Sequence, residues 1–254
     1  MTDLVLVERD GPVQIIRMNR PEKKNALTLD MYGAMADALA AGEADDGIGV
    51  QVMAGSGTDF TAGNDLNDFL RITRLAGTPL ERFLLALAGS RKPVLAAVKG
   101  AAIGIGSTML LHCDLVVAAR STRFQFPFVN LGLVPEAGSS LLLPRLAGHQ
   151  RAAELLLLGD PFDAEKAREI GMITAVAPDG EEEVQALALA ARLAQKPWGA
   201  VRRTKALMKG PAEEVLARID REARVFEEAL SSAELREAVA AFLERRPPDF
   251  SRCR

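Results

Sequence analysis

Two glycine-rich turns are the segments of this 254-residue chain whose composition best suits chemistry. The first is FTAGNDL, where Ala62 and Gly63 precede a helical stretch, and the second is GAAIGIGST, where Ile105 and Gly106 stand at a helix start. The first N–H groups of a helix lack internal acceptors and lie at the positive end of its dipole. Two such turns facing one point predict an oxyanion hole, which stabilises a developing negative charge.

The same turns also have a plain structural explanation. A chain that leaves a buried strand often reverses tightly, and glycine permits that reversal. GAAIGIG also lacks the spacing of a dinucleotide-binding fingerprint. The oxyanion hole therefore needs support from other residues.

Side chains for other kinds of catalysis are scarce. His112 and His149 stand far apart without a conspicuous Ser or Cys partner, and Cys113 and Cys253 are too few for a disulfide framework or a metal site. We expect no metal, and we expect catalysis to depend on carboxylates or on the backbone.

Composition excludes several classes of partner. The net charge of −3 and the single Trp and Tyr give no reason to expect nucleic acid. The N-terminal MTDLVLVERDG lacks the basic start and apolar run of a signal peptide, and no apolar stretch reaches the roughly 20 residues that span a bilayer. We therefore expect a cytoplasmic enzyme or binding protein with no membrane association.

The surrounding elements alternate between strand, turn and helix. Asp10-Gly11 lies between two β-rich runs and predicts a hairpin, and Thr28 is a candidate N-cap for a helix over 29–41. Short apolar runs predict buried strands over 48–54, 94–98 and 114–119. This order predicts an α/β fold with a largely parallel sheet.

The C-terminal part has a helical period and no convincing strand. We expect residues 1–196 to form the core with the active site and residues 197–254 to form a helical region for oligomerisation. Apolar faces in that region need a partner surface, and subunit association is one natural answer. Their members are Val215, Leu216, Ile219, Val225, Phe226 and Leu230.

Five segments together resemble the crotonase family, the enoyl-CoA hydratases and isomerases. They are NRPEKKNALT, FTAGNDL, KPVLAAVKGAAIGIGSTMLLHCDLVVAA, FQFPFVNLGLVPEAGSS and REAVAAFLERRPPDF, in the family's order and spacing. The resemblance implies a spiral of ββα units, a helical trimerisation region, and a homotrimer or dimer of trimers. It also implies an acyl-CoA substrate, with coenzyme A as part of the substrate and no separate cofactor. By motif, the oxyanion-hole amides fall on Ala62 and Ile105.

The positions of the carboxylates indicate which members of the crotonase family the chain resembles. Hydratases of the family use two glutamates, whose positions here hold Thr108 and Phe128, so efficient hydration is not expected. Glu136 in LGLVPEAGSS instead occupies the place of the catalytic Glu of Δ3,Δ2-enoyl-CoA isomerases, especially the peroxisomal type. Their SGNDL also resembles the AGNDL of Ala62 to Leu66.

This resemblance implies isomerisation of 3-enoyl-CoA to 2-trans-enoyl-CoA, in fatty acid or related acyl-CoA degradation. One carboxylate can remove a proton at C2 and return one at C4, while two amides hold the dienolate. An isolated Glu has a pKa of about 4.3, so it starts as the base, and burial near Leu133 and Val134 would raise its basicity. The alternative for Glu136 is an exposed acid in a Pro-Glu-Ala-Gly turn.

Several residues are candidates for substrate binding. Asp65 and Leu66 follow the first turn, where Asp65 either caps a helix or positions substrate. Lys23 and Lys24 are expected either to bind the phosphates of CoA or to form a solvated pair of charges. By resemblance, Phe242 and Arg245 reach the adenine and phosphate of CoA in a neighbouring subunit. Apolar residues that line an acyl pocket or only the core are Phe69, Leu70, Phe83 and Leu87.

Other functions remain open at this stage. One is a hydratase or another CoA-thioester activity, such as ring-isomerising, dehalogenating or hydrolytic chemistry. Another is a CoA-binding protein without catalysis, or an RNA-associated relative. The negative charge and the absence of a Lys-rich helix oppose the RNA alternative.

Overall fold

The N-terminal hairpin, which the sequence predicts, begins a six-stranded sheet. The computed structural model describes residues 3–65, 68, 74–209, 212–244 and 246–253. Strands β1 (Val5–Asp10) and β2 (Val13–Met18) pair antiparallel, with Asp10 opposite Val13 across the turn. The sheet continues in parallel through β3 (Val50–Gly55), β4 (Val94–Val98), β6 (Leu115–Ala119) and β9 (Ala175–Ala177).

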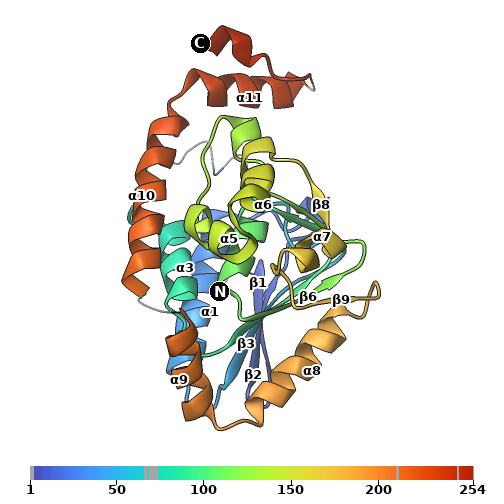
Figure 1. Ribbon diagram of the computed structural model, residues 1–254. Helices are drawn as coiled ribbons and strands as arrows, with labels where there is room; N and C mark the ends of the chain where they lie inside the picture. The colour runs from blue at the N-terminus through green and yellow to red at the C-terminus, as the bar shows by residue number, and fades with distance from the viewer. Residues whose placement is uncertain (1–2, 66–67, 69–73, 210–211, 245, 254) are drawn as a thin grey trace.

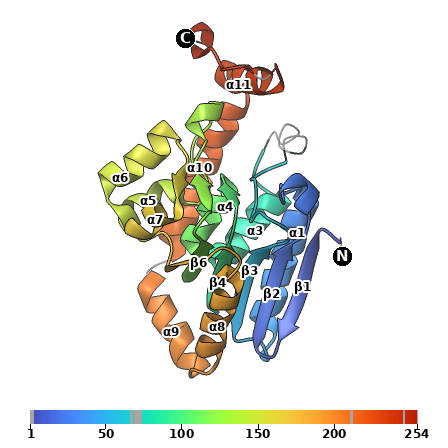
Figure 2. The ribbon, with the colours of Figure 1, turned by 90° about the vertical axis from the view of Figure 1, so that its right-hand side faces the viewer.

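Helices cover both faces of this sheet (Figure 2). Every residue of β3 and of β4 is buried, which explains their continuous apolar runs. Helix α8 (Glu182–Ala194) packs through Ala186 and Ala190 on one face. Helices α1 (Leu29–Ala44) and α3 (Pro79–Ala88) pack on the other. Thr28 caps α1 as predicted, and the helix runs on to Ala44 rather than ending at Ala41.

A second, small sheet gives the fold its repeat of strand, strand and helix. Its strands are β5 (Ala101–Ile103), β7 (Arg123–Gln125) and β8 (Phe162–Asp163). β4 leads into β5 and then into α4 (Ile105–Thr108), and β6 leads into β7 and onward to α5 (Ser139–Ala147). The expected α/β architecture with ββα units is therefore confirmed. The remaining short elements are η1 (Pro21–Lys23), η2 (Met109–His112), η3 (Val129–Leu131), α6 (His149–Ala153), η4 (Glu154–Leu158) and α7 (Ala164–Glu169).

The helix expected to start at Ile105 is not one continuous α-helix. It begins at Ile105 as predicted, but α4 has four residues and then tightens into the 3₁₀ helix η2. A four-residue helix has a small dipole, so local N–H geometry must supply most of any anion stabilisation.

The C-terminal region is helical, as expected. It contains α9 (Trp198–Lys209), α10 (Ala212–Leu230), α11 (Ala233–Glu244) and η5 (Phe250–Cys253). In Figure 1, α10 runs beside α3 and α5. Ile219 and Phe226 are buried there. Much of the apolar face that seemed to need another subunit is therefore covered within the same chain, although Val225 stays exposed.

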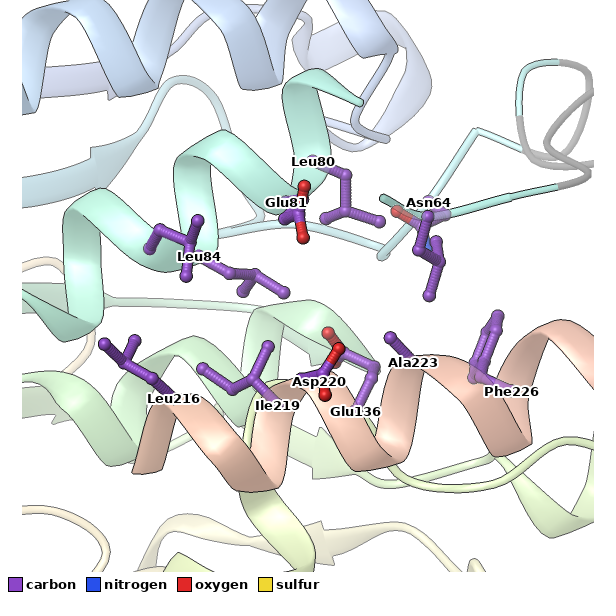
Figure 3. A pocket seen from close by; sticks show the side chains of 12 residues that line it. Asn64, Leu80, Glu81, Leu84, Glu136, Leu216, Ile219, Asp220, Ala223 and Phe226 are labelled. Carbon is purple, nitrogen blue, oxygen red and sulfur yellow. The ribbon is translucent and has the colours of Figure 1, made fainter. Parts of the chain in front are cut away.

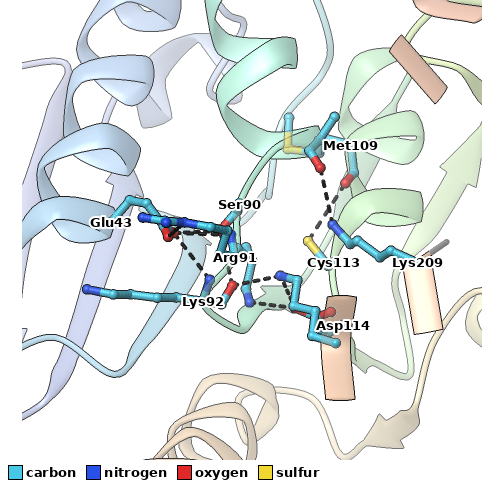
Figure 4. A network of polar contacts seen from close by, with 11 residues as sticks. Glu43, Ser90, Arg91, Lys92, Met109, Cys113, Asp114 and Lys209 are labelled. Carbon is cyan, nitrogen blue, oxygen red and sulfur yellow. Dashed lines mark hydrogen bonds and ion pairs between the residues drawn. The ribbon is translucent and has the colours of Figure 1, made fainter. Parts of the chain in front are cut away.

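A buried polar network fastens α9 to the sheet (Figure 4). Lys205 Nζ donates to Asp114 Oδ2 and to the Lys92 carbonyl, both at 2.6 Å. Asp114 Oδ2 also accepts the Val94 N–H at 2.8 Å. Asp114 is thus structural, as its position before β6 indicates. In the described part of the chain, no helix is long and apolar enough to cross a bilayer.

Candidate active site

Backbone hydrogen bonds bring the two glycine-rich turns together. Thr61 and Ala102 form a parallel bridge, in which Thr61 N–H donates to the Ala101 carbonyl at 2.9 Å and Ile103 N–H donates to the Thr61 carbonyl at 3.1 Å. Gly63 has a φ of +94°, and a Cβ on it would lie 3.0 Å from the Ile103 carbonyl oxygen. The close approach of the turns therefore requires glycine there.

The N–H expected to serve as donor in the first turn is already used, which corrects the prediction for Ala62. Ala62 N–H donates to the Lys24 carbonyl at 2.9 Å. Leu27 bridges Asn64 in parallel: it donates to the Gly63 carbonyl at 2.8 Å and accepts from Asp65 N–H at 2.9 Å. In a parallel bridge these bonds go to the flanking residues, so the N–H of Asn64 points away from Leu27.

Asn64 is therefore the candidate donor of the first turn. Within the described residues, its N–H has no hydrogen-bond acceptor. Its side chain is held by Tyr32, whose buried hydroxyl donates to Asn64 Oδ1. The pKa of Tyr32 is raised well above its usual value, mainly by burial and also by the charge of Glu136, so this donor stays protonated.

The candidate donor of the second turn is the one predicted, Ile105. It is the first residue of α4, and its N–H likewise lacks an acceptor among the described residues. Gly104 precedes it with φ 57° and ψ −117°, a conformation that side-chain-bearing residues rarely adopt. Gly104 thus sets the direction in which the Ile105 N–H points.

Both candidate donors line an apolar cavity, here called the α11 pocket. Its walls come from the two turns, the segment before and through η3, and helices α10 and α11. They are Ala62, Gly63, Asn64, Ile103, Gly104, Ile105, Pro127, Phe128, Leu131, Leu133, Phe226, Leu235, Ala238, Val239 and Phe242.

A second apolar cavity, called the α3–α10 pocket, lies between helices α3 and α10 (Figure 3). Leu80 and Leu84 of α3 face Leu216 and Ile219 of α10 across it. Its lining is Asn64, Leu75, Leu80, Glu81, Leu84, Leu85, Glu136, Leu216, Ile219, Asp220, Ala223 and Phe226. Asn64 and Phe226 line both cavities, so the two meet at the first turn.

Glu136 is buried beside this meeting point, which excludes the exposed-turn alternative. Its side chain is 7% exposed, Oε1 accepts a short hydrogen bond from Thr108 Oγ1, and Oε2 has no hydrogen-bond partner among the described residues. Burial raises the pKa of Glu136 to about 8; the charge of Glu222 adds to the rise and the Thr108 hydroxyl opposes it. At pH 7 most of the free protein therefore holds this group as the acid, whereas the sequence alone had it starting as the base.

A hydrogen bond from His112 supports the turn that carries Glu136. Ala137, the next residue, has a φ of +59°, which costs energy in any residue with a Cβ. Burial lowers the pKa of His112 to about 4, so its ring is neutral and Nε2–H donates to the Ala137 carbonyl at 2.7 Å. His112 is packed in the core, and it also supports this turn.

The structure does not bring the other predicted site residues together in one place. Asp65 accepts from Arg20 Nη1 at 2.7 Å, which ties the first turn to the segment before η1 and gives it a positioning role. Lys23 and Lys24 are exposed, and the Lys24 carbonyl accepts from the N–H of Ala62, which lines the α11 pocket. Phe242 is 62% exposed and lines that pocket. Leu66, Phe69, Leu70 and Arg245 lie outside the described residues.

Burial and the lining of the two pockets show where the remaining residues considered for the pocket lie. Phe83 and Leu87 are fully buried in the core and do not belong to the lining of either pocket. Thr108, at one hydratase position, binds Glu136, and Phe128, at the other, is an apolar wall of the α11 pocket. Among the described residues no cluster of three or more His, Cys, Asp or Glu is arranged to hold a metal ion.

Sequence reasoning missed three residues of this site. Asn64 stands in the same motif as Ala62, and only the pairing with Leu27 shows which amide is free. Tyr32 is the single Tyr of the chain, but its target lies 32 residues away. Glu222 of α10 binds the turn after Glu136 and carries no local signal among the other charged residues of its helix.

Fold and site together define an α/β protein with two free backbone amides beside a buried carboxylic acid. The sequence profile described as enoyl-CoA hydratase/isomerase matches residues 8–252, so the chain belongs to that family.

The relatives of the chain include one named as an isomerase and one named as a probable hydratase. The chain is 38% identical to 1,2-epoxyphenylacetyl-CoA isomerase of Escherichia coli (strain K12), over 99% of each chain. It is also 38% identical to a probable enoyl-CoA hydratase of Rhodobacter capsulatus, over 93% of each. A solved structure described as a putative enoyl-CoA hydratase/carnithine racemase from Magnetospirillum magneticum AMB-1 is 56% identical, with a TM-score of 0.82, and the match covers 99% of this chain and 100% of that one.

Proposed function

We propose that this protein isomerises 3-enoyl-CoA to 2-trans-enoyl-CoA with Glu136 as its single acid–base group. The observation that carries the proposal is the buried Glu136 carboxyl, which lines an apolar pocket together with Asn64 and whose Oε2 has no partner in the part of the chain that the structure describes. An unpartnered buried oxygen costs free energy unless the site uses it, so it is a candidate for contact with substrate.

Substrate placement follows from the two cavities. The thioester oxygen accepts from Asn64 N–H and Ile105 N–H, the acyl chain enters the α3–α10 pocket, and the coenzyme A side leaves through the α11 pocket toward Phe242. This arrangement puts the acyl carbons on the side of Glu136. Half of the residues that line the α3–α10 pocket are leucine or isoleucine, which suits an aliphatic chain.

The chemistry then needs one carboxyl. Ionised Glu136 takes a proton from C2, the electrons move onto the thioester oxygen as a dienolate, and the two amides stabilise that charge. The protonated carboxyl next gives its proton to C4, the double bond comes to lie between C2 and C3, and Glu136 is ionised again.

Hydration is disfavoured by the same residues. A water molecule needs a second acid or base to hold and deprotonate it. Thr108 donates its hydroxyl to Glu136, and Phe128 offers only an aromatic face. Glu81 and Asp220 also line the α3–α10 pocket, but Glu81 accepts from Gly77 N–H and Asp220 pairs with Arg224. We therefore propose slow or no addition of water.

A second candidate is isomerisation of 1,2-epoxyphenylacetyl-CoA. The observation in its favour is the 38% identity, over 99% of each chain, to the relative that bears that name. A thioester enolate next to one carboxyl is compatible with either substrate, and the two differ in the shape of the acyl group.

The test is a comparison of three substrates with the wild-type protein. We expect rapid conversion of 3-hexenoyl-CoA to the conjugated isomer, with little loss of conjugated absorbance from crotonyl-CoA. Faster turnover of 1,2-epoxyphenylacetyl-CoA would favour the second candidate. Rapid hydration of crotonyl-CoA would contradict the proposal.

A further inference from the structure

The start of helix α5 needs acceptors that its own sequence does not supply. Its N-cap is Gly138, which has no side chain, so no side-chain cap forms there. The first amides of a helix have no internal partner and must be satisfied from elsewhere. The Ser139 amide and hydroxyl both bond back to the Glu136 carbonyl, at 3.1 and 2.6 Å.

A carboxylate from a distant helix satisfies two more of these groups. Glu222 of α10 accepts from Gly138 N–H at 2.5 Å and from Ser140 N–H at 2.9 Å. Glu222 is only 6% exposed and lies 84 residues beyond Gly138 in sequence. It therefore caps α5 in place of a local residue, with a charge that suits a helix N-terminus.

The capped segment is the strained turn that presents Glu136. Ala137 and Gly138 follow Glu136 with φ values of +59° and +73°. A non-glycine residue keeps such a conformation only when its surroundings hold it. His112 holds the Ala137 carbonyl from one side, and Glu222 holds the Gly138 amide from another.

Helix α10 also lines the proposed substrate pocket with the same face. Ile219, Ala223 and Phe226 line the α3–α10 pocket, and Glu222 stands three residues after Ile219 and four residues before Phe226. Residues at this spacing share one face of a helix. The position of α10 therefore determines both the wall of the α3–α10 pocket and the position of the Glu136 turn.

We propose that Glu222 is a positioning residue for the reaction, whose carboxylate holds the Glu136–Gly138 turn in the conformation that aims Glu136 at the acyl carbons. This inference rests on the proposed function for its kinetic part. Its structural part, the control of Glu136 by a charge on α10, does not depend on which thioester reacts.

Glu222 also acts on Glu136 through its charge. Its negative charge contributes to the raised pKa of Glu136, so removing that charge lowers this pKa. Other titratable or charged side chains near Glu136 or its turn come from each element packed around it: Tyr32 (α1), Glu81 (α3), His112 (η2), and Arg218 and Asp220 (α10).

Three variants on α10 test the inference. Glu222→Gln removes the charge and one of the two acceptor oxygens, Glu222→Asp keeps the charge but shortens the reach, and Glu228→Gln is a control at an exposed position on the same helix. Two quantities are measured: kcat and KM for 3-hexenoyl-CoA, and the titration of the Glu136 carboxylic C=O band by infrared spectroscopy. Glu136→Gln identifies that band by its loss.

We expect Glu222→Gln to lower kcat on the order of 10- to 100-fold with little change in KM, because the base is misplaced rather than the substrate. The Glu136 band should titrate at lower pH than in the wild type. Glu222→Asp should lower kcat and leave the titration near the wild-type pH. Glu228→Gln should match the wild type in both.

Two results would overturn the inference. One is a Glu222→Gln protein with the wild-type kcat and the wild-type titration of Glu136. The other, which decides if that variant does not fold, is an unchanged kcat in Glu222→Asp. If the wild type does not turn over 3-enoyl-CoA, the proposed function fails, while the infrared titration still tests the link between Glu222 and Glu136.

Discussion

At the scale of single residues, the site depends on how burial and one hydroxyl set the basicity of Glu136. Burial favours the neutral acid, and the Thr108 hydroxyl favours the carboxylate because it donates to Oε1. The balance gives a pKa of about 8. A strong base that is present in a minor fraction at pH 7 suits the removal of a weakly acidic proton at C2.

This balance predicts the pH dependence of the reaction. Since the ionised form is the base, kcat/KM should rise with pH and level off above about 8. Thr108→Val removes the bond that stabilises the carboxylate, so the midpoint should move about one to two pH units higher, as expected for a hydrogen bond to a charged group. The measurement is a pH profile of kcat/KM for both proteins. A profile that shifts to lower pH in the variant would show that the hydroxyl has the opposite role.

The Ile105 amide can be tested by removing its hydrogen. Ile105 is the first residue of α4, where proline is well tolerated because the N–H is not part of the helix. Ile105→Pro should lower kcat by about 100- to 1000-fold, the usual effect of losing one oxyanion-hole donor. Ile105→Val keeps the amide and serves as the control for the change in side chain. Equal rates in the two variants would remove Ile105 from the oxyanion hole.

At the scale of elements, the sequence correctly predicts the features that depend on side chains within a few residues of one another. The Asp10-Gly11 hairpin, the Thr28 cap and the buried strands β3, β4 and β6 all follow from side-chain types over a few residues. The start of α4 at Ile105 was also predicted, but its change to a 3₁₀ helix was not.

Pairings between distant segments could not be predicted in this way. Which amide of FTAGND is free depends on the bridge between Leu27 and Asn64, which joins segments 37 residues apart. This is why the motif alone points to Ala62 and does not identify Asn64. The position of Glu136 could be predicted from its motif, but its burial against Thr108 and its control by Glu222 depend on the tertiary fold.

The pairing of α3 with α10 predicts a preference for acyl chain length. Ile219 faces Leu84 across the α3–α10 pocket (Figure 3), so Ile219→Trp should fill its far part. The variant should keep most of its kcat/KM with 3-hexenoyl-CoA and lose activity with 3-dodecenoyl-CoA. Each methylene excluded from the pocket costs about 0.8 kcal/mol, so the loss should grow with chain length. An equal effect on both substrates would place the acyl chain elsewhere.

At the scale of the whole molecule, the C-terminal region has two faces. One face of α10 lines the α3–α10 pocket and holds the Glu136 turn, so the region 197–254, for which oligomerisation is predicted, also contributes residues to the proposed site of its own chain. On other surfaces large apolar side chains stay exposed: Leu207 and Met208 on α9 at 85% and 79%, and Leu243 on α11 at 71%. Exposed apolar patches of this kind often mark subunit contacts.

The trimer implied by the family resemblance therefore remains a prediction with a defined test. We expect the wild type to sediment as a trimer or hexamer, and the double variant Leu207→Glu, Met208→Glu to shift toward the monomer, because two buried carboxylates would be unpaired at the contact. Sedimentation velocity measures both. A monomeric wild type would contradict the prediction, and an unchanged oligomer in the variant would place the contact on another surface.

The central claim, that one buried carboxyl carries out both proton transfers, is tested most directly by the rate of 3-enoyl-CoA isomerisation in Glu136→Gln. The variant keeps the size of the side chain and removes the base, so we expect a loss of about 100- to 10,000-fold in kcat. Binding of a saturated acyl-CoA to the same preparation should stay within a few-fold of the wild type. A Glu136→Gln protein that isomerises 3-enoyl-CoA at the wild-type rate would contradict the account.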